Sequence, residues 1–521
     1  MIKEIDIVIA PHEADNETIL KKIISEESGF DVEQINGYKI LKRSIDARSR
    51  NIKIQLKVQA YFQESFPEKK ISTIVYPNSS NKEKVIIAGA GPAGLFAALR
   101  LIELGKKPVI IERGKNVKDR RRDLAAINKQ HIVNPDSNYC FGEGGAGTYS
   151  DGKLYTRSKK RGDVSRILDI FVAHGANEDI LTNAHPHIGT NKLPDIIASM
   201  RETILNAGGE IHFNTRITDF IIEKNVFKGV ITLDEKEFLA DNIILATGHS
   251  ARDIFKLLHK KNILIEAKPF AMGVRVEHPQ SLIDSIQYHC PMEEVENTRK
   301  HLPAAAYSLV TQVHQKGIYS FCMCPGGIIA PCATDAEQVV TNGWSPSKRN
   351  NPFANSGLVV SIELADLKKY AEHGALAGMY YQQELEKMAF EAGGKTQTAP
   401  AQRLLDFIQN KTSETLPECS YQPGIKSAAL HELLSAPIRF SLQEGLKFFG
   451  KKMPKYLTNE AVIVGVETRT SSPVKIPRDK ETLEHPQIKG FYPCGEGAGY
   501  AGGIVSAAID GEKCAEAIAQ K

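Results

Sequence analysis

Alternation of polar and apolar residues predicts a small α+β unit at the start of the chain. Residues 52–60 alternate strictly between apolar side chains and lysine or glutamine, the pattern of a half-buried strand. Apolar residues at helical spacing follow Asp15 and Asn16, either of which can cap a helix. Two more strands are expected near residues 2–9 and 37–45. The order is therefore β-α-β-β, and we assign residues 1–80 to this N-terminal appendage, with 65–84 as a linker.

From Val85 onward the pattern changes to strand, glycine turn, helix and strand. A helix is predicted over 192–207, two or more strands over 210–232, and a buried strand over 242–246. Residues 266–454 mix strand-like and helical runs, and the tail returns to strand, glycine loop and helix. This alternation is typical of an α/β fold with a parallel sheet. We expect one domain built from 81–265 and 455–521, with an inserted mixed α+β cap or substrate domain at 266–454.

A glycine-rich turn after the strand at Val85 predicts a Rossmann-type dinucleotide site. Gly89, Gly91 and Gly94 have the G-x-G-x-x-G spacing, which gives a tight turn, room for a pyrophosphate and close packing of helix on strand. The helix N-terminus can bind the phosphates. Glu112 ends the next strand, where an acid can accept hydrogen bonds from the adenosine ribose of FAD or NAD. The candidate residues are Gly89, Ala90, Gly91, Pro92, Ala93, Gly94, Glu112 and Arg113.

Two later segments favour FAD over NAD. An apolar strand ends in Ala246, Thr247 and Gly248, and a second strand leads into Gly495 and Glu496. A long helix then opens at Gly502, Gly503 and Ile504. Glu496 can accept a hydrogen bond from a ribityl hydroxyl, and the positive end of the helix can face the pyrimidine edge of a flavin. A cofactor that extends across the whole domain needs such a second loop.

Composition excludes several classes of protein. The 521 residues carry a net charge of +4 and 25% charged residues, which is ordinary globular usage with no global field for nucleic acid or membrane. The chain starts without a signal peptide and lacks the roughly 18 apolar residues of a membrane helix, so we expect a cytoplasmic protein. Eight cysteines form no C-x-x-C pair, and the His185-Pro-His187 stretch lacks further ligands. We therefore expect no metal.

The chain resembles known flavoproteins over nearly its whole length. GAGPAG at 89–94, ILATG at 244–248 and PCGEGAGYAGGIVSAAIDG at 493–511 resemble the FAD domain of glutathione-reductase-type proteins. The motifs KRSIDAR, FGEGGAGTYSDGKL, HIGTNKLP, KPFAMGVRVEHPQ, FCMCPGG and VETRTSSPVKIPRD resemble a family of FAD-dependent dehydrogenases of unknown substrate. Geranylgeranyl reductase-like proteins are more distantly similar.

The resemblance implies FAD at the glycine, acid and Ala-Thr-Gly positions named above. It adds the loop Gly144, Gly145, Ala146, Gly147 and Thr148, which lies along the cofactor in such flavoproteins. Glu496 stands where the usual motif has aspartate, and it keeps the acceptor with a longer reach. The resemblance implies no substrate and no second nucleotide site, so NAD(P)H is a candidate only as a transient reductant.

Three residues are candidates for catalysis. Lys153 lies close to the glycine loop and can stabilise a reduced flavin, although a structural pair with Asp151 is the alternative. Cys324 is a candidate thiol, although buried cysteines more often act as small hydrophobes. Arg275 is a candidate substrate ligand, with a structural pair to Glu277 as the alternative.

These features predict an FAD-dependent oxidoreductase, either a dehydrogenase or a reductase. It would transfer hydride or electrons between an external donor and an unidentified small organic substrate. One alternative is a flavin-dependent monooxygenase. The other is an RNA- or protein-binding factor with a structural or sensory flavin, which would act through the basic N-terminal residues Lys42, Arg43 and Arg48. A solvated sheet face is the simpler interpretation of those basic residues.

Overall fold

The N-terminal unit has the predicted β-α-β-β order. A computed structural model describes residues 1–67, 74–156 and 162–521, so part of the expected linker at 65–84 lies outside the described residues. The strands β1 (Ile2–Ile9), β2 (Ile35–Asp46) and β3 (Lys53–Phe62) form an antiparallel sheet in the order β1-β3-β2. Helix α1 (Glu17–Ser28) begins where the Asn16 side chain accepts the N–H groups of Thr18 and Ile19.

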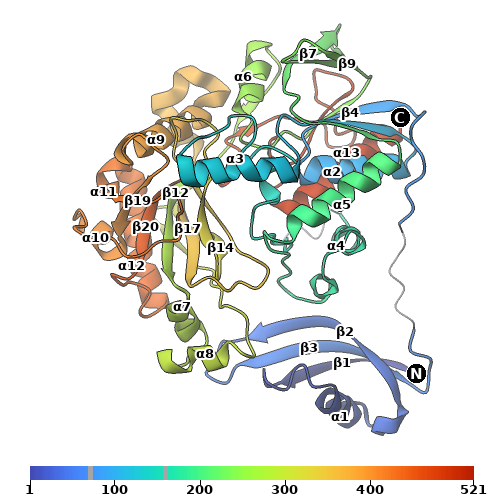
Figure 1. Ribbon diagram of the computed structural model, residues 1–521, viewed down its shortest axis with the longest axis vertical. Coiled ribbons are helices and arrows are strands. Elements are labelled where there is room, and N and C mark those ends of the chain that lie inside the picture. The colour runs from blue at the N-terminus through green and yellow to red at the C-terminus, as the bar shows by residue number, and fades with distance from the viewer. Residues whose placement is uncertain (68–73, 157–161) are drawn as a thin grey trace.

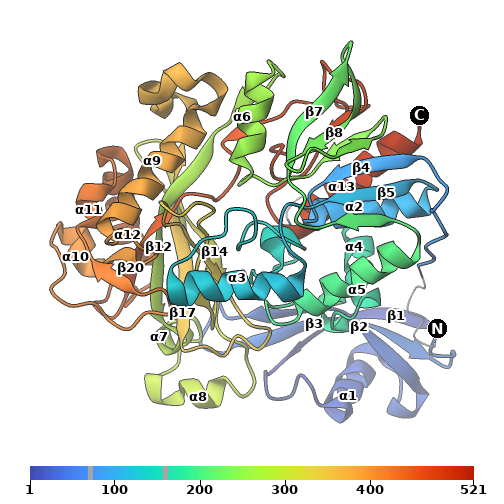
Figure 2. The same cartoon turned by 45° about the horizontal axis from the view of Figure 1, so that its top comes forward.

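A five-stranded parallel sheet forms the centre of the second unit; Figure 1 labels its strand β4, and Figure 2 its strands β4 and β5. Its order is β22-β10-β4-β5-β6, which fits a Rossmann-type domain. The strands are β4 (Lys84–Ala88), β5 (Lys107–Ile111), β6 (Glu210–His212), β10 (Ile243–Leu245) and β22 (Phe491–Pro493). Strand β10 pairs with β4 on one side and with β22 on the other. It thereby links the strands that come early in the sequence to β22, which lies near the end of the chain.

Both faces of this sheet are covered, which explains why its strands are largely apolar, apart from the edge strand β6. Val85 and Ile87 pack against the helices of one face, and Ile86 and Ala88 pack on the opposite face. The first face carries α2 (Pro92–Glu103), α4 (Val164–Ala173), α5 (Leu193–Asn206) and α13 (Ile504–Ala519). The second carries the antiparallel strands β7 (Ile217–Glu223), β8 (Val226–Thr232) and β9 (Glu237–Leu239), together with α6 (Arg252–Lys260).

The inserted region is built on a seven-stranded sheet in the order β13-β14-β17-β12-β20-β18-β19. These strands are β12 (Phe270–Pro279), β13 (Val310–Val313), β14 (Lys316–Cys324), β17 (Phe353–Ile362), β18 (Ala399–Arg403), β19 (Ile425–Ser427) and β20 (Val462–Glu467). Helices α9 (Ala377–Ala392), α10 (Leu404–Gln409), α11 (Leu430–Leu433) and α12 (Ala436–Lys452) pack beside it. The sequence placed everything from residue 455 in the FAD-binding domain, whereas β20 belongs to this sheet. We refer to the sheet and these helices as the cap.

Short elements complete the path of the chain. The two-stranded pairs are β15 (Ile328–Pro331) with β16 (Thr341–Trp344), and β11 (Glu266–Ala267) with β21 (Val474–Lys475). Helices α7 (Gln280–Gln287) and α8 (Val295–Thr298) extend from the cap toward the N-terminal unit (Figure 1). Within the described residues, no helix combines the length and the apolar character that crossing a membrane requires.

The N-terminal unit contacts both of the other units. The His289 ring nitrogen Nε2 lies 3.0 Å from the carbonyl oxygen of Ala47, and Arg43 exchanges backbone hydrogen bonds with Thr182 and Ala184. Much of its positive charge is paired, because Arg43 meets Asp15, Arg48 meets Asp46 and Lys57 meets Glu4. This pairing weakens the electrostatic case for nucleic acid binding on the basic face.

Candidate functional site

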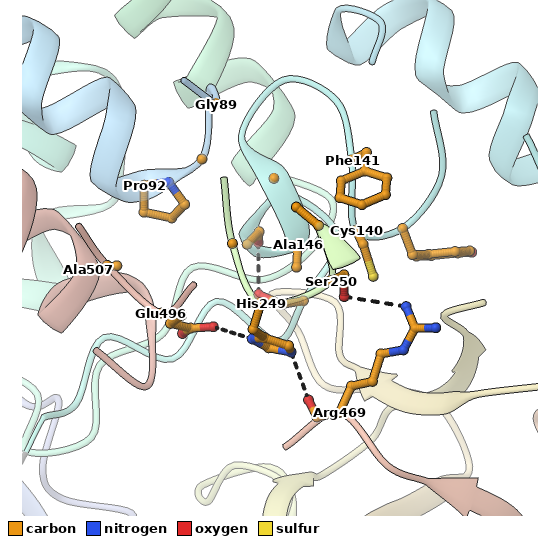
Figure 3. Close-up of a pocket in the computed structure, with 18 of the residues that line it drawn as sticks. Gly89, Pro92, Cys140, Phe141, Ala146, His249, Ser250, Arg469, Glu496 and Ala507 are labelled. Carbon is orange, nitrogen blue, oxygen red and sulfur yellow. Dashed lines mark hydrogen bonds and ion pairs between the residues drawn. The ribbon is translucent and has the colours of Figure 1, made fainter. Parts of the chain in front are cut away.

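A cavity of about 430 Å³ lies between the parallel sheet and the cap. At one end it is lined by glycine-rich loops that follow β4, β10 and β22 and by the loop at 145–147. The other end is lined by residues of β14, β16 and the segment 149–155. Figure 3 shows the middle of the cavity, where Gly89, Pro92, Ala146, His249 and Glu496 come from segments far apart in the sequence. These distant loops therefore form one site.

Close approach between loops explains two of the glycines. Gly89 has φ of 103°, and a Cβ atom there would lie 2.6 Å from the carbonyl oxygen of Ala246. Gly145 has φ of 59°, and a Cβ atom there would lie 3.1 Å from the Cα atom of Gly91. Only glycine adopts such conformations without strain. The loop at Gly89 therefore contacts the backbone of Ala246, and the loop at Gly145 contacts the backbone of Gly91. No side chain of these two glycines enters the cavity beside them.

Two long helices begin at this cavity without side-chain caps. The N-cap residue of α2 is Gly91 and that of α13 is Gly503, and neither helix start receives a side-chain hydrogen bond at its cap. The first residues of both helices line the cavity. Their free N–H groups and positive dipole ends suit a diphosphate and the electron-rich edge of a flavin.

Glu112 holds the loops together from the end of β5. Its carboxylate accepts the N–H groups of Ala90 at 2.8 Å, Gly114 at 2.8 Å and Gly142 at 2.9 Å. The side chain is 5% exposed and also lines the cavity. Oε2 receives only one of these bonds, so it can accept another from a ribose hydroxyl, as the sequence predicts. The loop-holding role was not foreseen.

Arg113 lines the cavity next to Glu112, and its guanidinium group forms ion pairs with two acidic side chains. Its guanidinium donates to Asp136 at 2.7 Å and to Asp253 at 2.9 Å, and it lies 4.3 Å from the centre of the Phe141 ring. Two carboxylates beside one arginine disfavour a 2′-phosphate at this end of the cavity, which agrees with an unphosphorylated ribose.

Glu496 meets a histidine that the sequence reasoning did not consider. Oε2 of Glu496 lies 3.3 Å from Nδ1 of His249, and Nε2 of His249 lies 3.1 Å from the carbonyl oxygen of Arg469 (Figure 3). The carbonyl can only accept, so Nε2 carries a proton. His249 directly follows the Ala246-Thr247-Gly248 turn, and this position was the available signal for it.

A buried arginine fixes the loop that the resemblance added. The charged run at 118–123 lies within helix α3 (Val117–Gln130), and one of its arginines is buried. Arg120 is fully buried and donates to the carbonyl oxygens of Asn138 at 2.7 Å and Glu143 at 2.8 Å. Thr148 donates to the same Glu143 carbonyl at 2.7 Å. Thr148 thus stabilises the loop through this hydrogen bond and does not line the cavity.

Lys153 reaches the end of the cavity that faces the cap. Its ammonium group donates to the carbonyl oxygen of Met323 on β14 and lies 3.9 Å from Oδ2 of Asp151. Burial disfavours the charged ammonium form and by itself would lower the pKa of Lys153. The electrostatic effects of Cys322, Cys324 and Asp151 are larger together and raise this pKa. Lysine therefore keeps its charge here.

Asp151 lines the cavity beside Lys153 and has an oxygen without a partner. Oδ2 accepts from Arg349 at 2.7 Å, while Oδ1 is buried and unbonded among the described residues. Burial would raise the pKa of Asp151, but Lys153 and Arg349 together hold it below its usual range. A charged, buried acceptor is thus available to a ligand at this end.

Two of the three catalytic candidates lie behind the cavity wall. Arg275 is fully buried and pairs with Glu467 at 3.0 Å, so the alternative of a structural pair holds with a different partner from Glu277. Glu277 instead accepts the N–H of Ser420 at 2.7 Å. Cys324 is also fully buried and does not line the cavity. The neighbouring Cys322 lines it instead.

The remaining candidates divide between the cavity wall and its support. Gly89, Gly91, Pro92, Ala93, Ala146, Gly147, Ala246, Thr247, Gly248, Gly495, Gly502, Gly503 and Ile504 line the cavity. Ala90, Gly94 and Gly144 do not line it, and they act through packing and hydrogen bonds. A Cβ atom at Gly94 would lie 2.0 Å from the carbonyl oxygen of Gly89, which is the close helix–strand contact that the motif predicts.

Comparison with known proteins identifies the family. Residues 269–470 match the family described as "FAD-dependent protein, C-terminal domain-like", and residues 1–61 match a domain of unknown function. A Clostridium beijerinckii protein, described as an uncharacterized protein, is 38% identical over 528 residues, covering 97% of each chain. The chain belongs to this family of FAD-dependent proteins. FAD is its cofactor, and the glycine loops, uncapped helices and Glu112 fit that molecule.

Other similarities are partial. A thiamine thiazole synthase of Aeropyrum pernix is 27% identical over 185 residues, which cover 33% of this chain and 56% of that protein. A solved flavoprotein/dehydrogenase from Cytophaga hutchinsonii is 12% identical and covers 84% of this chain and 78% of its own, with a TM-score of 0.35.

Proposed function

We propose that this FAD-dependent protein is an oxidoreductase, a dehydrogenase or reductase, whose organic substrate binds between the cofactor and the cap. The observation that carries the proposal is the single cavity. It extends from the glycine loops of the parallel sheet to Asp151, Lys153 and Cys322 at the cap. A cofactor held at the first end would leave the second end to another molecule.

FAD supplies two-electron oxidation and reduction when it is bound, and the protein supplies position and charge. The free N–H groups at the start of α2 would bind the diphosphate, and those of α13 would stabilise negative charge on the flavin edge. Glu112 and Glu496 would accept hydrogen bonds from hydroxyl groups of the cofactor. Lys153 and Asp151 offer a donor and a free acceptor that orient the substrate.

Reduction of the flavin would come from an external donor, with NAD(P)H a candidate that docks transiently. Among the described residues, the parallel sheet β22-β10-β4-β5-β6 is the one sheet of Rossmann type, and FAD occupies its glycine loop in this proposal. A pyridine nucleotide would therefore bind at the open side of the cavity rather than in a domain of its own.

The proposal is tested by anaerobic reduction of the purified holoenzyme followed by a panel of organic oxidants. The flavin absorbance near the visible maximum reports reoxidation. We expect one class of small organic molecule to restore the oxidised spectrum, and a Lys153→Met variant to respond more slowly to it. A matched control is Lys228→Met, a half-exposed lysine on β8, which should respond as the wild type does.

Two results would contradict the proposal. Reoxidation only by oxygen, with insertion of an oxygen atom into the organic substrate, would indicate a monooxygenase. A flavin that no donor reduces, combined with salt-sensitive RNA binding lost in Arg43→Gln or Arg48→Gln, would indicate a binding protein with a structural flavin.

A further inference from the structure

Cys322 occupies an unusual backbone position at the cap end of the cavity. It has φ of 45° without being glycine, and it lies where the pairing of β14 with β17 shifts register between Phe321 and Cys324. Left-handed conformations of non-glycine residues are strained and gather at functional sites. In a strand with regular alternation of side chains, Cys322 and Cys324 would lie on the same face of the sheet. The register shift places them on different sides. Cys322 lines the cavity and Cys324 is buried.

Cationic groups surround this cysteine. Nη2 of Arg275 donates to the carbonyl oxygen of Cys322 at 2.7 Å, and the Lys153 ammonium group donates to the next carbonyl, that of Met323. Cys324 contributes its thiol, which donates to the carbonyl oxygen of Cys322 at 3.2 Å. The acids near Cys322 are Asp151 and Glu467, and each is paired with an arginine.

We propose that Cys322 is a nucleophilic thiolate that adds to an electrophilic, carbonyl-conjugated carbon of a ligand at the cap end of the cavity. The geometry carries this assignment: a strained cavity-facing cysteine, two cations on its flanks and a second thiol behind it. Lys153 is the adjacent proton donor. The assignment goes beyond the proposed oxidoreduction and does not depend on which substrate the flavin oxidises or reduces.

The electrostatics of the pair agree with the geometry. The neighbouring Cys324 thiol lowers the pKa of Cys322 most; burial opposes this, and Lys153 and Arg275 add to the lowering, which brings the value to about 5. Burial and the neighbouring Cys322 raise the pKa of Cys324. Cys324 therefore keeps its proton, which it donates to the carbonyl oxygen of Cys322.

The addition step balances without an oxidant. The sulfur of Cys322 forms a bond to the β-carbon of the conjugated alkene, and the alkene π pair moves toward the carbonyl group. The Lys153 ammonium stabilises the charge that develops on the carbonyl oxygen and supplies the proton that the α-carbon takes. Water then restores the proton to the lysine amine. No electrons are gained or lost overall.

Cys332 offers an internal comparison within the same cavity. It also lines the wall, but burial raises its pKa well above the ordinary value, so its thiol stays protonated. At pH 6 the thiolate fraction of a thiol of pKa 5 is about 300-fold larger than that of an ordinary thiol. Each thiolate of the lower pKa is, however, about 40-fold less nucleophilic, which reduces the gain in rate by that factor. Cys322 should therefore react about tenfold faster than an ordinary thiol.

The test uses N-ethylmaleimide, a carbonyl-conjugated alkene, on the full-length protein with FAD bound. Labelling is followed by peptide mass spectrometry from pH 4.5 to pH 8. We expect Cys322 to be labelled first, with a rate that levels off above about pH 6, whereas Cys332 is labelled slowly or not at all. Cys322→Ala removes the fast phase and should still fold, because Arg275 binds the backbone carbonyl rather than the thiol.

Lysine variants test the proposed role of Lys153. In Lys153→Met the pH midpoint for labelling Cys322 should move upward, and in Lys153→Arg it should stay low. FAD absorbance reports whether each variant is folded. If the methionine variant loses FAD, the wild-type profile and the arginine variant still decide the question.

Three outcomes would overturn the assignment. The first is no labelling of Cys322 while FAD is bound, including labelling that begins only after FAD is removed. The second is a labelling rate that keeps rising about tenfold per pH unit to pH 8, as for an ordinary thiol. The third is an unchanged midpoint in a folded Lys153→Met variant. Loss of oxidoreductase activity alone would bear on the proposed function and not on this site, because labelling needs no turnover.

Discussion

Replacing Glu112 with glutamine should loosen the loops that hold FAD. Oε1 accepts two N–H groups, from Gly114 and Gly142, and Oε2 accepts the N–H of Ala90. An amide can keep the first two bonds on its oxygen, but its NH₂ group then faces the Ala90 N–H. The loss of one charge-assisted bond and the buried N–H left unpaired together cost about 2–4 kcal/mol.

The size of the effect on FAD follows from where these bonds lie. The Ala90 bond joins the turn at 89–94 to β5, and the Gly142 bond joins the loop at 141–148 to the same strand. If FAD binding closes these loops, a cost of about 3 kcal/mol raises the FAD dissociation constant by up to about 100-fold. Part of the cost falls on the FAD-free protein as well, and this part lowers its stability instead.

Two measurements check this prediction. Quenching of FAD fluorescence gives the dissociation constant, and urea unfolding of the FAD-free protein gives the change in stability. The matched control is Glu83→Gln, which removes the half-exposed pair with Lys106 and should change either quantity by less than about 1 kcal/mol. Equal behaviour of the two variants in both assays would refute the loop-holding role of Glu112.

Three further perturbations probe the site and its support. Arg120→Met should leave the Asn138 carbonyl without its buried donor and the Glu143 carbonyl with the Thr148 bond alone, at a cost of about 3 kcal/mol; a thermal scan should show FAD release several degrees earlier, and an unchanged release temperature would contradict this. Gly145→Val should abolish FAD binding, because its Cβ would lie 3.1 Å from Gly91 and φ is positive; absorbance of the purified variant reports it. Burial raises the pKa of Glu277 to about 7 against 4.5 in the unfolded chain, so its stabilising contribution is complete below pH 4.5 and is lost as the pH rises to about 7. Glu277→Gln should flatten the fall of the unfolding midpoint between pH 5 and pH 7.

The sequence was sufficient wherever the information is local. Glycine spacing at 89–94 predicts the turn between β4 and α2, because each glycine answers a steric need within a few residues. Apart from the edge strand β6, the strands of the parallel sheet are short apolar runs, since both faces are buried. Asp15 and Asn16 could be named as candidate helix caps from their own chemistry, and the structure has Asn16. These elements appear at the predicted places.

Side-chain pairs between residues that are distant in the sequence could not be predicted from local patterns. Arg275 pairs with Glu467, which lies on β20, rather than with Glu277 two residues away. The strand order that brings β20 beside β12 decides this, and no local pattern encodes it. The same strand order overturned the domain boundary at residue 455.

A local irregularity was responsible for the misplaced cysteine. In a regular strand, Cys322 and Cys324 would share a face, because side chains alternate with a period of two. The register shift in β14 changes the direction of one of them. Bulges of this kind occur next to active sites and redirect a single side chain. The sequence therefore pointed to this segment, but the cysteine that lines the cavity is Cys322 rather than Cys324.

A buried charge network indicates how the cap is held beside the cavity. Glu386 of α9 accepts hydrogen bonds from Arg252 of α6 at 2.7 Å and from Arg469 at 3.0 Å. Burial alone would raise the pKa of Glu386, but the two arginines lower it to about 2, so the charge persists at any physiological pH.

Movement of the cap away from α6 would separate these charges inside the protein, which is costly when a buried ion loses its partner. Arg469 also lines the cavity, so the same network shapes the wall that a ligand meets. We infer that access to the flavin depends on the open side of a preformed cavity rather than on hinge opening of the cap. The chemistry of Asp151, Lys153 and Cys322 is then the main basis on which the site can select its ligand.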